Sequence, residues 1–177
     1  MDKNKSISKF LSYVLRHDPA SIQLQLDAHG WANVNELLKQ AQQHGKRFTL
    51  EQLETVVAES DKQRFAFSDD KTRIRANQGH SITVELDLLP VAPPEFLYHG
   101  TVGKFVSLIR ENGLLKMSRQ HVHLTDNRKT AEKVGSRRGV PVILTVRSGE
   151  MHRNGMHFFL SENGVWLTDH VPSVYIQ

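Results

Sequence analysis

The spacing of apolar residues changes near residue 60, and this change limits the possible folds more than any other feature of the chain. Up to that point apolar residues recur every three or four positions, which predicts helices with one buried face. We expect a helix over residues 7–15, a second from an N-cap at Asn33 to a stop at Gly45, and a third from Thr49 to Val57.

Each predicted helix has recognisable end signals. Asp18-Pro19 ends the first helix, because the residue before a proline avoids the helical region. Asn33-Val-Asn-Glu36 and Thr49-Leu-Glu-Gln52 both resemble capping boxes, in which two side chains bond the first free N–H groups. The buried face of the third helix is expected to consist of Leu50, Leu53, Val56 and Val57.

After residue 60 the apolar period becomes two, as in a β-strand. Phe65 and Phe67 alternate with other residues, residues 68–71 form a turn cluster, and Ile74 lies between two arginines, so we predict a β-hairpin. Three helices followed by a basic hairpin are typical of a winged-helix module. Such modules commonly bind nucleic acid, but they also mediate protein contacts.

Val91-Ala-Pro-Pro94 is the best candidate for a linker, since two prolines interrupt any helix or strand. It divides the chain into a first domain of residues 1–90 and a second of residues 91–177. The second domain is expected to have a mostly β core, which makes the fold class α+β. Its helices are expected over residues 102–111 and 127–134, and its strands over residues 96–98, 122–125, 140–146, 158–160 and 165–167.

Composition narrows the functions that the chain can have. The 177 residues include no cysteine, which excludes disulfides, zinc ribbons and thiol catalysis. No apolar run approaches the roughly 20 residues that cross a bilayer, and residues 1–8 lack a signal-peptide pattern, so we expect a cytoplasmic protein with no membrane partner. The net charge of +4 favours a polyanionic partner, although many enzymes of this charge bind no nucleic acid. No coiled-coil heptads appear, and a monomer is expected.

Polar residues at three places in the first domain could bind an anion. Arg16-His17 closes the first predicted helix and suits a phosphate, but helix C-termini favour cations in any case. Arg64 should point away from the core because Phe65 points into it, and a solvated strand residue would do the same. The loop of residues 75–81 is either an ordinary connection or a phosphate- or sugar-binding loop, with donors from Arg75, Gln78 and His80.

The second domain contains candidate nucleotide contacts but neither usual nucleotide fingerprint. His99-Gly100-Thr101 is expected between a strand and a helix, where Gly100 would let a ligand approach the backbone and its neighbours would bond sugar hydroxyls. His121 and His123 share one side of a strand and favour a pocket wall over a zinc site, which needs a third protein ligand. Arg137 and Arg138 lie between two glycines and suggest an anion site.

Taken together and in this order, these segments resemble the RNA 2′-phosphotransferase family from about residue 8 to residue 175. That family has an N-terminal winged-helix-like lobe that engages RNA and a C-terminal ADP-ribosyltransferase-like lobe that holds NAD, with no metal. The matching motifs are Leu15-Arg-His-Asp-Pro19, Lys62-Gln-Arg-Phe65, Ile74-Arg-Ala-Asn-Gln-Gly-His-Ser81, Tyr98-His-Gly-Thr101, His121-Val-His-Leu124, Gly135-Ser-Arg-Arg-Gly139 and Asn163-Gly-Val-Trp166.

The resemblance implies roles for individual residues. Val165 stands where many ADP-ribosyltransferases have a glutamate, and a 2′-phosphate, already an anion, needs no base to attack. The implied catalytic residues are Arg16, His17, Arg64 and Arg137, with Arg138 as the alternative to Arg137. The implied NAD contacts are His99, Gly100, Thr101, Ser118, Arg119 and His123. The implied RNA contacts are Arg75, Gln78, His80 and Arg138.

The implied reaction removes an internal 2′-phosphate from RNA such as tRNA and consumes NAD. Its products are RNA with a 2′-hydroxyl, nicotinamide and ADP-ribose 1″,2″-cyclic phosphate. Two other functions stay open at this point: an ADP-ribosyltransferase that caps nucleic-acid ends, and a winged-helix binding protein without catalysis. A metal-dependent hydrolase is a further alternative, and a chelator would abolish its activity.

Overall fold

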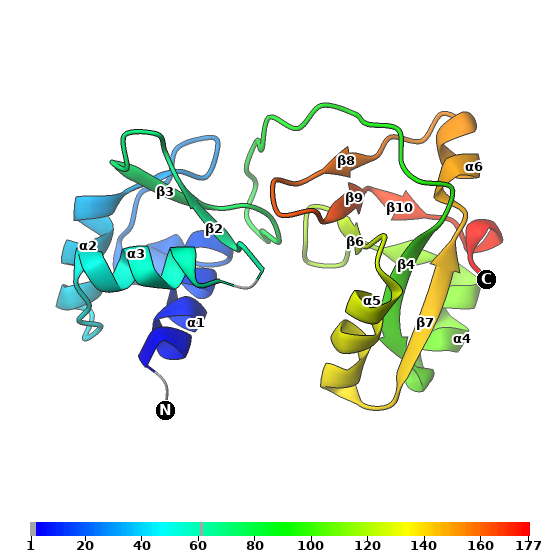
Figure 1. Cartoon of the computed structure of the whole chain (residues 1–177), viewed down its shortest axis with the longest axis horizontal. Coiled ribbons are helices and arrows are strands. Elements are labelled where there is room, and N and C mark those ends of the chain that lie inside the picture. The colour runs from blue at the N-terminus through cyan, green and yellow to red at the C-terminus, as the bar shows by residue number, and fades with distance from the viewer. Residues whose placement is uncertain (1–2, 61) are drawn as a thin grey trace. The chain divides into compact units, whose positions relative to one another are not determined.

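The computed structural model describes residues 3–60 and 62–177, which belong to two compact units (Figure 1). The first unit covers Met1–Asp87 and the second Leu88–Gln177. Both combine helices with small antiparallel sheets, so the expected α+β class is confirmed at this level. Within the described residues no helix is long and apolar enough to cross a membrane.

The first unit packs helices against a three-stranded antiparallel sheet of order β1-β3-β2 (Figure 1). The predicted hairpin is present, with Phe65 opposite Ala76 and Phe67 opposite Ile74. The short first strand, which adds to the other edge of β3, was not predicted from the sequence. The elements are α1 (Lys3–Arg16), η1 (Pro19–Ile22), β1 (Ala32–Asn33), α2 (Val34–Gln43), α3 (Leu50–Ala58), β2 (Phe65–Phe67) and β3 (Arg73–Ala76).

Helix α1 begins at Lys3, four residues before the predicted start, whereas the predicted ends of α2 and α3 are confirmed by their hydrogen bonds. The Asn33 side chain accepts from the Glu36 N–H at 3.0 Å, but the Glu36 side chain does not complete the predicted capping box, whereas both bonds of the Thr49/Gln52 box are present. Gly45 ends α2 with a φ of +80°, a conformation that glycine adopts without steric cost. The Lys46 N–H then bonds the Ala41 carbonyl at 2.8 Å, which fixes the chain as it leaves the helix.

The predicted buried face of α3 is wrong at one position. Leu53 and Val56 are buried, and Val57 packs partly against the same core, but Leu50 is 44% exposed. Leu50 is the first residue of the helix and lies at the edge of its apolar stripe. An apolar residue at a helix end therefore does not have to enter the core.

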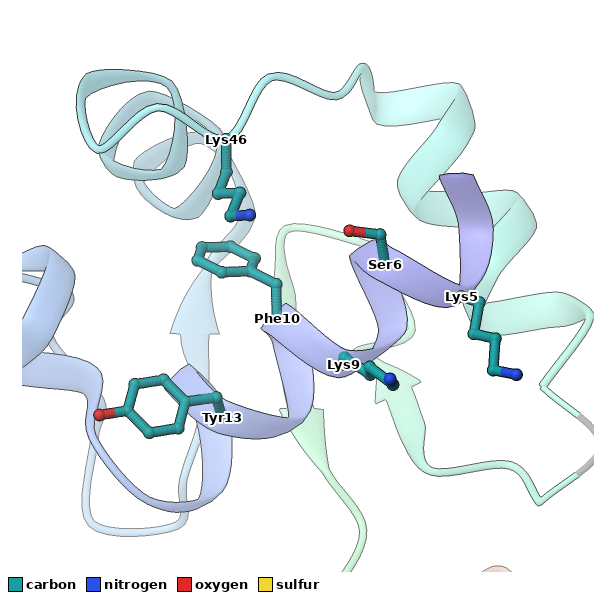
Figure 2. Close-up of a pocket in the computed structure, with 6 residues that line it drawn as sticks. All are labelled: Lys5, Ser6, Lys9, Phe10, Tyr13 and Lys46. Carbon is teal, nitrogen blue, oxygen red and sulfur yellow. The ribbon is translucent and has the colours of Figure 1, made fainter. Parts of the chain in front are cut away.

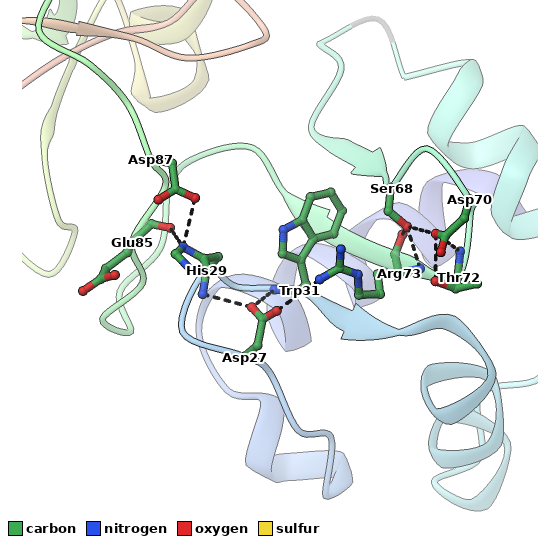
Figure 3. A network of polar contacts seen from close by, with 9 residues as sticks. All are labelled: Asp27, His29, Trp31, Ser68, Asp70, Thr72, Arg73, Glu85 and Asp87. Atoms are coloured by element: carbon green, nitrogen blue, oxygen red, sulfur yellow. Dashed lines mark hydrogen bonds and ion pairs between the residues drawn. The ribbon is translucent and has the colours of Figure 1, made fainter.

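The loops of the first unit are held by acidic side chains that accept backbone N–H groups (Figure 3). Asp70 accepts from Ser68 Oγ and from the Thr72 N–H and Oγ1, and these bonds lower the pKa of Asp70 to about 2. Asp27 Oδ1 accepts the N–H groups of His29 and Trp31, each at 2.9 Å. The first network closes the β2–β3 turn, and the second shapes the loop before β1.

The second unit is built on a two-stranded sheet, β4–β7, and a three-stranded sheet of order β6-β9-β8 (Figure 1). Its core contains Leu97, Val146, Met151, Phe158 and Trp166. The elements are β4 (Leu97–Val102), α4 (Gly103–Asn112), β5 (Leu114–Leu115), β6 (Val122–Leu124), α5 (Arg128–Gly135), η2 (Ser136–Arg138), β7 (Pro141–Val146), α6 (Ser148–Arg153), β8 (Phe159–Leu160), β9 (Trp166–Thr168), β10 (His170–Val171) and η3 (Ser173–Tyr175).

The expected position of His99-Gly100-Thr101 after a strand is wrong, because β4 continues through all three residues. Every residue of β4 pairs with β7, from Leu97 opposite Val146 to Val102 opposite Pro141. The polar residues and the glycine resemble a strand end, but the ladder to β7 outweighs that local signal. The predicted strand of residues 140–146 is also one residue too long, since Val140 is 84% exposed and lies outside β7.

The segment predicted as a linker is bonded to the second unit. The Val91 N–H bonds the Phe158 carbonyl at 2.8 Å, and Ser148 Oγ donates to the Pro94 carbonyl at 2.7 Å. Glu95 then accepts two hydrogen bonds of 2.8 Å from the Arg153 guanidinium. The prolines therefore interrupt regular structure without leaving this part of the chain unattached.

Candidate functional site

The loop after β3 joins the backbones of two predicted phosphate ligands in the first unit. The Ser81 N–H bonds the carbonyl of Arg16, and the Asn77 N–H bonds the carbonyl of Arg64, both at 2.9 Å. One short stretch of chain thus holds the C-terminal end of α1 and the start of β2. These two hydrogen bonds fix the backbone positions of Arg16 and Arg64.

His17 and Arg16 are oriented by contacts that were not part of the predicted site. His17 Nδ1 lies 2.9 Å from Ser81 Oγ, and the Arg16 guanidinium lies 5.9 Å from the centre of the Phe65 ring. Ser81 belongs to the loop motif but carries no signal that would single it out. With Nδ1 engaged by Ser81, Nε2 is the ring nitrogen of the exposed His17 that can meet a substrate.

Arg75 is held by an aromatic residue that was not expected in the site. Its guanidinium lies 4.5 Å from the centre of the Trp31 ring, and the Arg73 guanidinium lies 5.3 Å from the same ring. Cation–π contacts of this kind position a guanidinium without neutralising it. Gln78, from the same loop, is half-buried. The tryptophan alone gave no sequence signal for this role.

His80 lies beneath these residues and is 1% exposed. Burial, followed by the positive charges of Arg16, His17 and Arg75, lowers the pKa of His80 to about 4. Neither ring nitrogen has a hydrogen-bond partner among the described residues. His80 is therefore an uncharged, buried residue behind the cationic ones at neutral pH, and its contact with RNA stays a prediction.

We expect His80 to make the first unit less stable in acid. In the unfolded chain His80 takes up a proton below a pH of about 6.5, but in the folded protein it does so only near pH 4. The folded state is therefore favoured most above a pH of about 6.5, and this contribution to the free energy of unfolding falls as the pH drops below that value. Between about pH 7.5 and pH 5 the loss should be about 2 kcal/mol. Urea unfolding followed by Trp31 fluorescence in a Trp166→Phe background measures it. His80→Gln should remove that part of the pH dependence, and an unchanged dependence would contradict the assignment.

In the second unit, two predicted NAD contacts are linked through the backbone. His99 Nδ1 lies 3.1 Å from the His123 carbonyl and must donate, which leaves Nε2 as an acceptor. Burial lowers the pKa of His99 despite this bond, and the Arg119 charge lowers it further. His123 Nδ1 in turn lies 3.0 Å from an Arg119 guanidinium nitrogen and accepts from it. Both imidazoles are therefore best described as neutral.

Three guanidinium groups of this unit lie within electrostatic reach of one another. Partial burial, followed by the charges of Arg138 and Arg137, lowers the pKa of Arg119. Arg137 and Arg138 are both exposed on the short helix η2, between Gly135 and Gly139. Cations gathered in this way create a positive potential that attracts anions. Arg137 and Arg138 are alike in exposure and setting, so the choice between them stays a prediction.

Gly100 lies where a helix and a strand cross closely, and its predicted approach to a ligand stays a prediction. A methyl group there would overlap the Ala131 carbonyl oxygen and would lie 2.9 Å from the Gly135 nitrogen, so the backbone of α5 lies directly against β4. At Gly135 the corresponding atom would lie 2.7 Å from the Thr101 oxygen. The two glycines allow helix and strand to cross closely, and Thr101 is consequently 8% exposed.

The remaining predicted contacts are more peripheral. Ser118 is exposed and follows Met117, whose φ is +54°. The His121 ring lies 5.8 Å from the Phe159 ring, and burial lowers the pKa of His121. Over residues 3–60 and 62–177, no three histidine or acidic side chains converge into a group that could hold a metal ion.

The folds and side chains described above define an α+β protein with cationic, histidine-containing sites in both units. Its sequence matches the model of the family described as RNA 2′-phosphotransferase, Tpt1 / KptA family, over residues 2–170. The chain therefore belongs to the RNA 2′-phosphotransferase family.

Relatives from several bacteria match along nearly their whole length. A protein of Flavobacterium johnsoniae named "Probable RNA 2′-phosphotransferase" is 62% identical, with 98% of this chain and 95% of the relative covered. Proteins of the same name from Burkholderia pseudomallei and Streptomyces griseus are 55% and 49% identical. These matches cover 96% of this chain and 92% of the first relative, and 99% of this chain and 98% of the second.

Proposed function

We propose that this protein is an NAD-dependent transferase that removes an internal 2′-phosphate from RNA. The observation that carries the proposal is its membership of the RNA 2′-phosphotransferase family over nearly the whole chain. Arginine or histidine side chains in both units stand at the positions where the family motifs require them. We further propose that the first unit is a winged-helix-like RNA-binding lobe and the second an ADP-ribosyltransferase-like NAD-binding lobe.

The reaction consists of two displacements. In the first, an oxygen of the RNA 2′-phosphate bonds to the NAD ribose carbon that bears nicotinamide, and nicotinamide leaves with the electrons of its bond. In the second, the neighbouring ribose hydroxyl gives up its proton and bonds to phosphorus, while the bond from phosphorus to the RNA 2′-oxygen breaks and that oxygen takes up a proton, so no net proton is gained or lost. The products are RNA with a 2′-hydroxyl and ADP-ribose 1″,2″-cyclic phosphate. Catalysis of such transfers depends on positioning and charge stabilisation.

The first unit supplies cations and a proton donor for the phosphate. Arg16 and Arg64, fixed through their carbonyls by the loop of residues 77–81, would neutralise the phosphate oxygens. His17 would protonate the leaving 2′-oxygen from Nε2, since Ser81 engages Nδ1. We propose Arg137 as the fourth catalytic residue, from its place in the family motif. Arg75 and Gln78 would bind neighbouring parts of the RNA, and Arg138 would do so if it is not itself the fourth catalytic residue.

The donor set of the second unit fits NAD. The neutral His99 offers Nε2 as an acceptor for a ribose hydroxyl, and the backbone contact to His123 keeps its ring in place. Arg119 is a candidate to bind the pyrophosphate, with Ser118 beside it and Thr101 close to His99 in β4. Bound NAD would supply the electrophilic ribose carbon and a stable leaving group.

One assay tests the proposal. The purified protein is incubated with NAD, a chelator and a short RNA that carries one internal 2′-phosphate. We expect the RNA to lose its phosphate and ADP-ribose 1″,2″-cyclic phosphate to appear, because no metal is needed. ADP-ribose that stays on the RNA would instead identify an enzyme that stops after the first displacement. No consumption of NAD would identify a binding protein, and a requirement for metal would identify a hydrolase.

A further inference from the structure

The outer face of α1 carries a cationic cavity that the proposed reaction does not use. The cavity measures about 310 Å³ and is lined by six residues of the first unit. Figure 2 shows five of these side chains on α1 and the sixth approaching from the loop after α2. The six residues are Lys5, Ser6, Lys9, Phe10, Tyr13 and Lys46, which we call the α1 groove.

Three ammonium groups of the α1 groove are available to an anion. Lys5, Lys9 and Lys46 are exposed, and none of them has an ion-pair partner within residues 3–60 and 62–177. The backbone of Lys46 is set by its 2.8 Å hydrogen bond to the Ala41 carbonyl. Its position beside α1 is thus a consequence of the way α2 ends.

Two aromatic rings line the α1 groove beside these cations, with Phe10 between Lys9 and Lys46 and Tyr13 one turn beyond Lys9 (Figure 2). Phe10 packs edge-on against Phe48, with 6.0 Å between the ring centres, and both rings pack against the core of the first unit. Tyr13 is 49% exposed, and its hydroxyl donates to Asp18 at 2.9 Å. Cations interleaved with aromatic rings are the combination that binds single-stranded nucleic acid, through phosphates and stacked bases.

The α1 groove lies on the helix whose C-terminal end carries the proposed phosphate ligands Arg16 and His17. Residues four apart on a helix advance by only about 40° around its axis, so Lys5, Lys9 and Tyr13 form one slowly winding row. The next position in this row is His17, and Arg16 lies beside it. From Lys5 to Arg16 the helix rises about 16 Å, enough for a few nucleotides of an extended strand.

We propose that the α1 groove binds the RNA strand that flanks the 2′-phosphate. Lys5, Lys9 and Lys46 would contact backbone phosphates, and the Tyr13 ring would stack on a base. This inference rests on the proposed function, because it takes Arg16 and His17 as the point where the 2′-phosphate is bound. It assigns to the enzyme a preference for long substrates over minimal ones.

The first test measures binding without NAD, so that no turnover occurs. A labelled RNA of about twelve nucleotides with one internal 2′-phosphate is titrated at several salt concentrations. Each lost phosphate contact on a single strand reduces the slope of log K against log salt by about 0.7, so K5A/K9A should lower it by roughly 1.4 and weaken low-salt binding roughly tenfold. The matched control K39A/K71N removes two exposed cations elsewhere in the unit and should change neither the salt slope nor the low-salt affinity. Equal slopes for the wild type and K5A/K9A would overturn the proposal.

The second test compares substrates of different length with NAD present. K5A/K9A should lower kcat/KM for the long RNA roughly tenfold and leave a 2′-phosphorylated dinucleotide within about twofold of wild type. Equal losses on both substrates would overturn the groove as a site for the flanking strand. Y13A should weaken the long RNA selectively while Y13F does not, because stacking needs the ring and not the hydroxyl. A wild-type protein that acts on neither RNA would disprove the proposed function. The salt slopes would still show whether the α1 groove binds RNA.

Discussion

Replacing Arg64 with alanine is expected to slow removal of the 2′-phosphate roughly 100-fold, the cost of losing a preorganised donor to developing charge. The Asn77 N–H bonds the Arg64 carbonyl, a backbone contact that alanine retains. The variant should therefore fold normally and lose only the guanidinium. Single-turnover measurement of phosphate loss with saturating NAD isolates this effect from substrate binding.

Two further variants make the Arg64 result specific. Arg64→Lys should recover part of the rate, since lysine keeps the charge but not the planar fork that matches two phosphate oxygens. Lys39→Ala removes an exposed cation of α2 and should leave the rate within about twofold of wild type. An Arg64→Ala enzyme with unchanged turnover would remove this arginine from the site.

Replacing Gly100 with alanine is expected to destabilise the second unit by about 4 kcal/mol or more, among the largest effects of a single substitution. The new methyl group would overlap the backbone of Ala131 in α5, which cannot rotate away as a side chain would. Urea unfolding followed by fluorescence of the buried Trp166, in a Trp31→Phe background, reports on this unit.

Gly103 provides a matched control three residues further on. A methyl group there meets no described atom within 4 Å, and Gly103 is the first residue of α4, where alanine favours the helix. Gly103→Ala should be neutral or stabilising by up to about 1 kcal/mol. If Gly100→Ala unfolds at the same urea concentration as Gly103→Ala, the close crossing of α5 and β4 is not a structural requirement.

Local signals in the sequence predicted the first unit well because its elements are defined by short-range chemistry. The caps at Asn33 and Thr49 and the stop at Gly45 depend on residues within four positions of one another, and all three are confirmed. The hairpin could likewise be read from alternation and a turn cluster. The exposure of Leu50 could not be predicted in this way, because the limit of a buried helix face depends on what packs against it.

The second unit was harder to predict because its structure depends on contacts between distant segments. The helix α6 has six residues, too few to show an apolar period, and it is held by a Ser148 bond to Pro94 and by burial of Met151. The path of β4 through Gly100 depends on its partner strand and on α5. The predicted catalytic and binding roles came from the family motifs, since a cation at a helix end, such as Arg16, is common for other reasons.

The two buried clusters described above have a consequence for biosynthesis. The first cluster uses residues from Ile7 to Ala76 and the second residues from Leu97 to Val171, so neither needs a side chain from the other. Because the ribosome makes the N-terminal half first, that half can close its sheet on β3 while the rest is still being translated. The unit with the proposed RNA groove can thus be fully folded before the second unit, proposed to bind NAD, has been made.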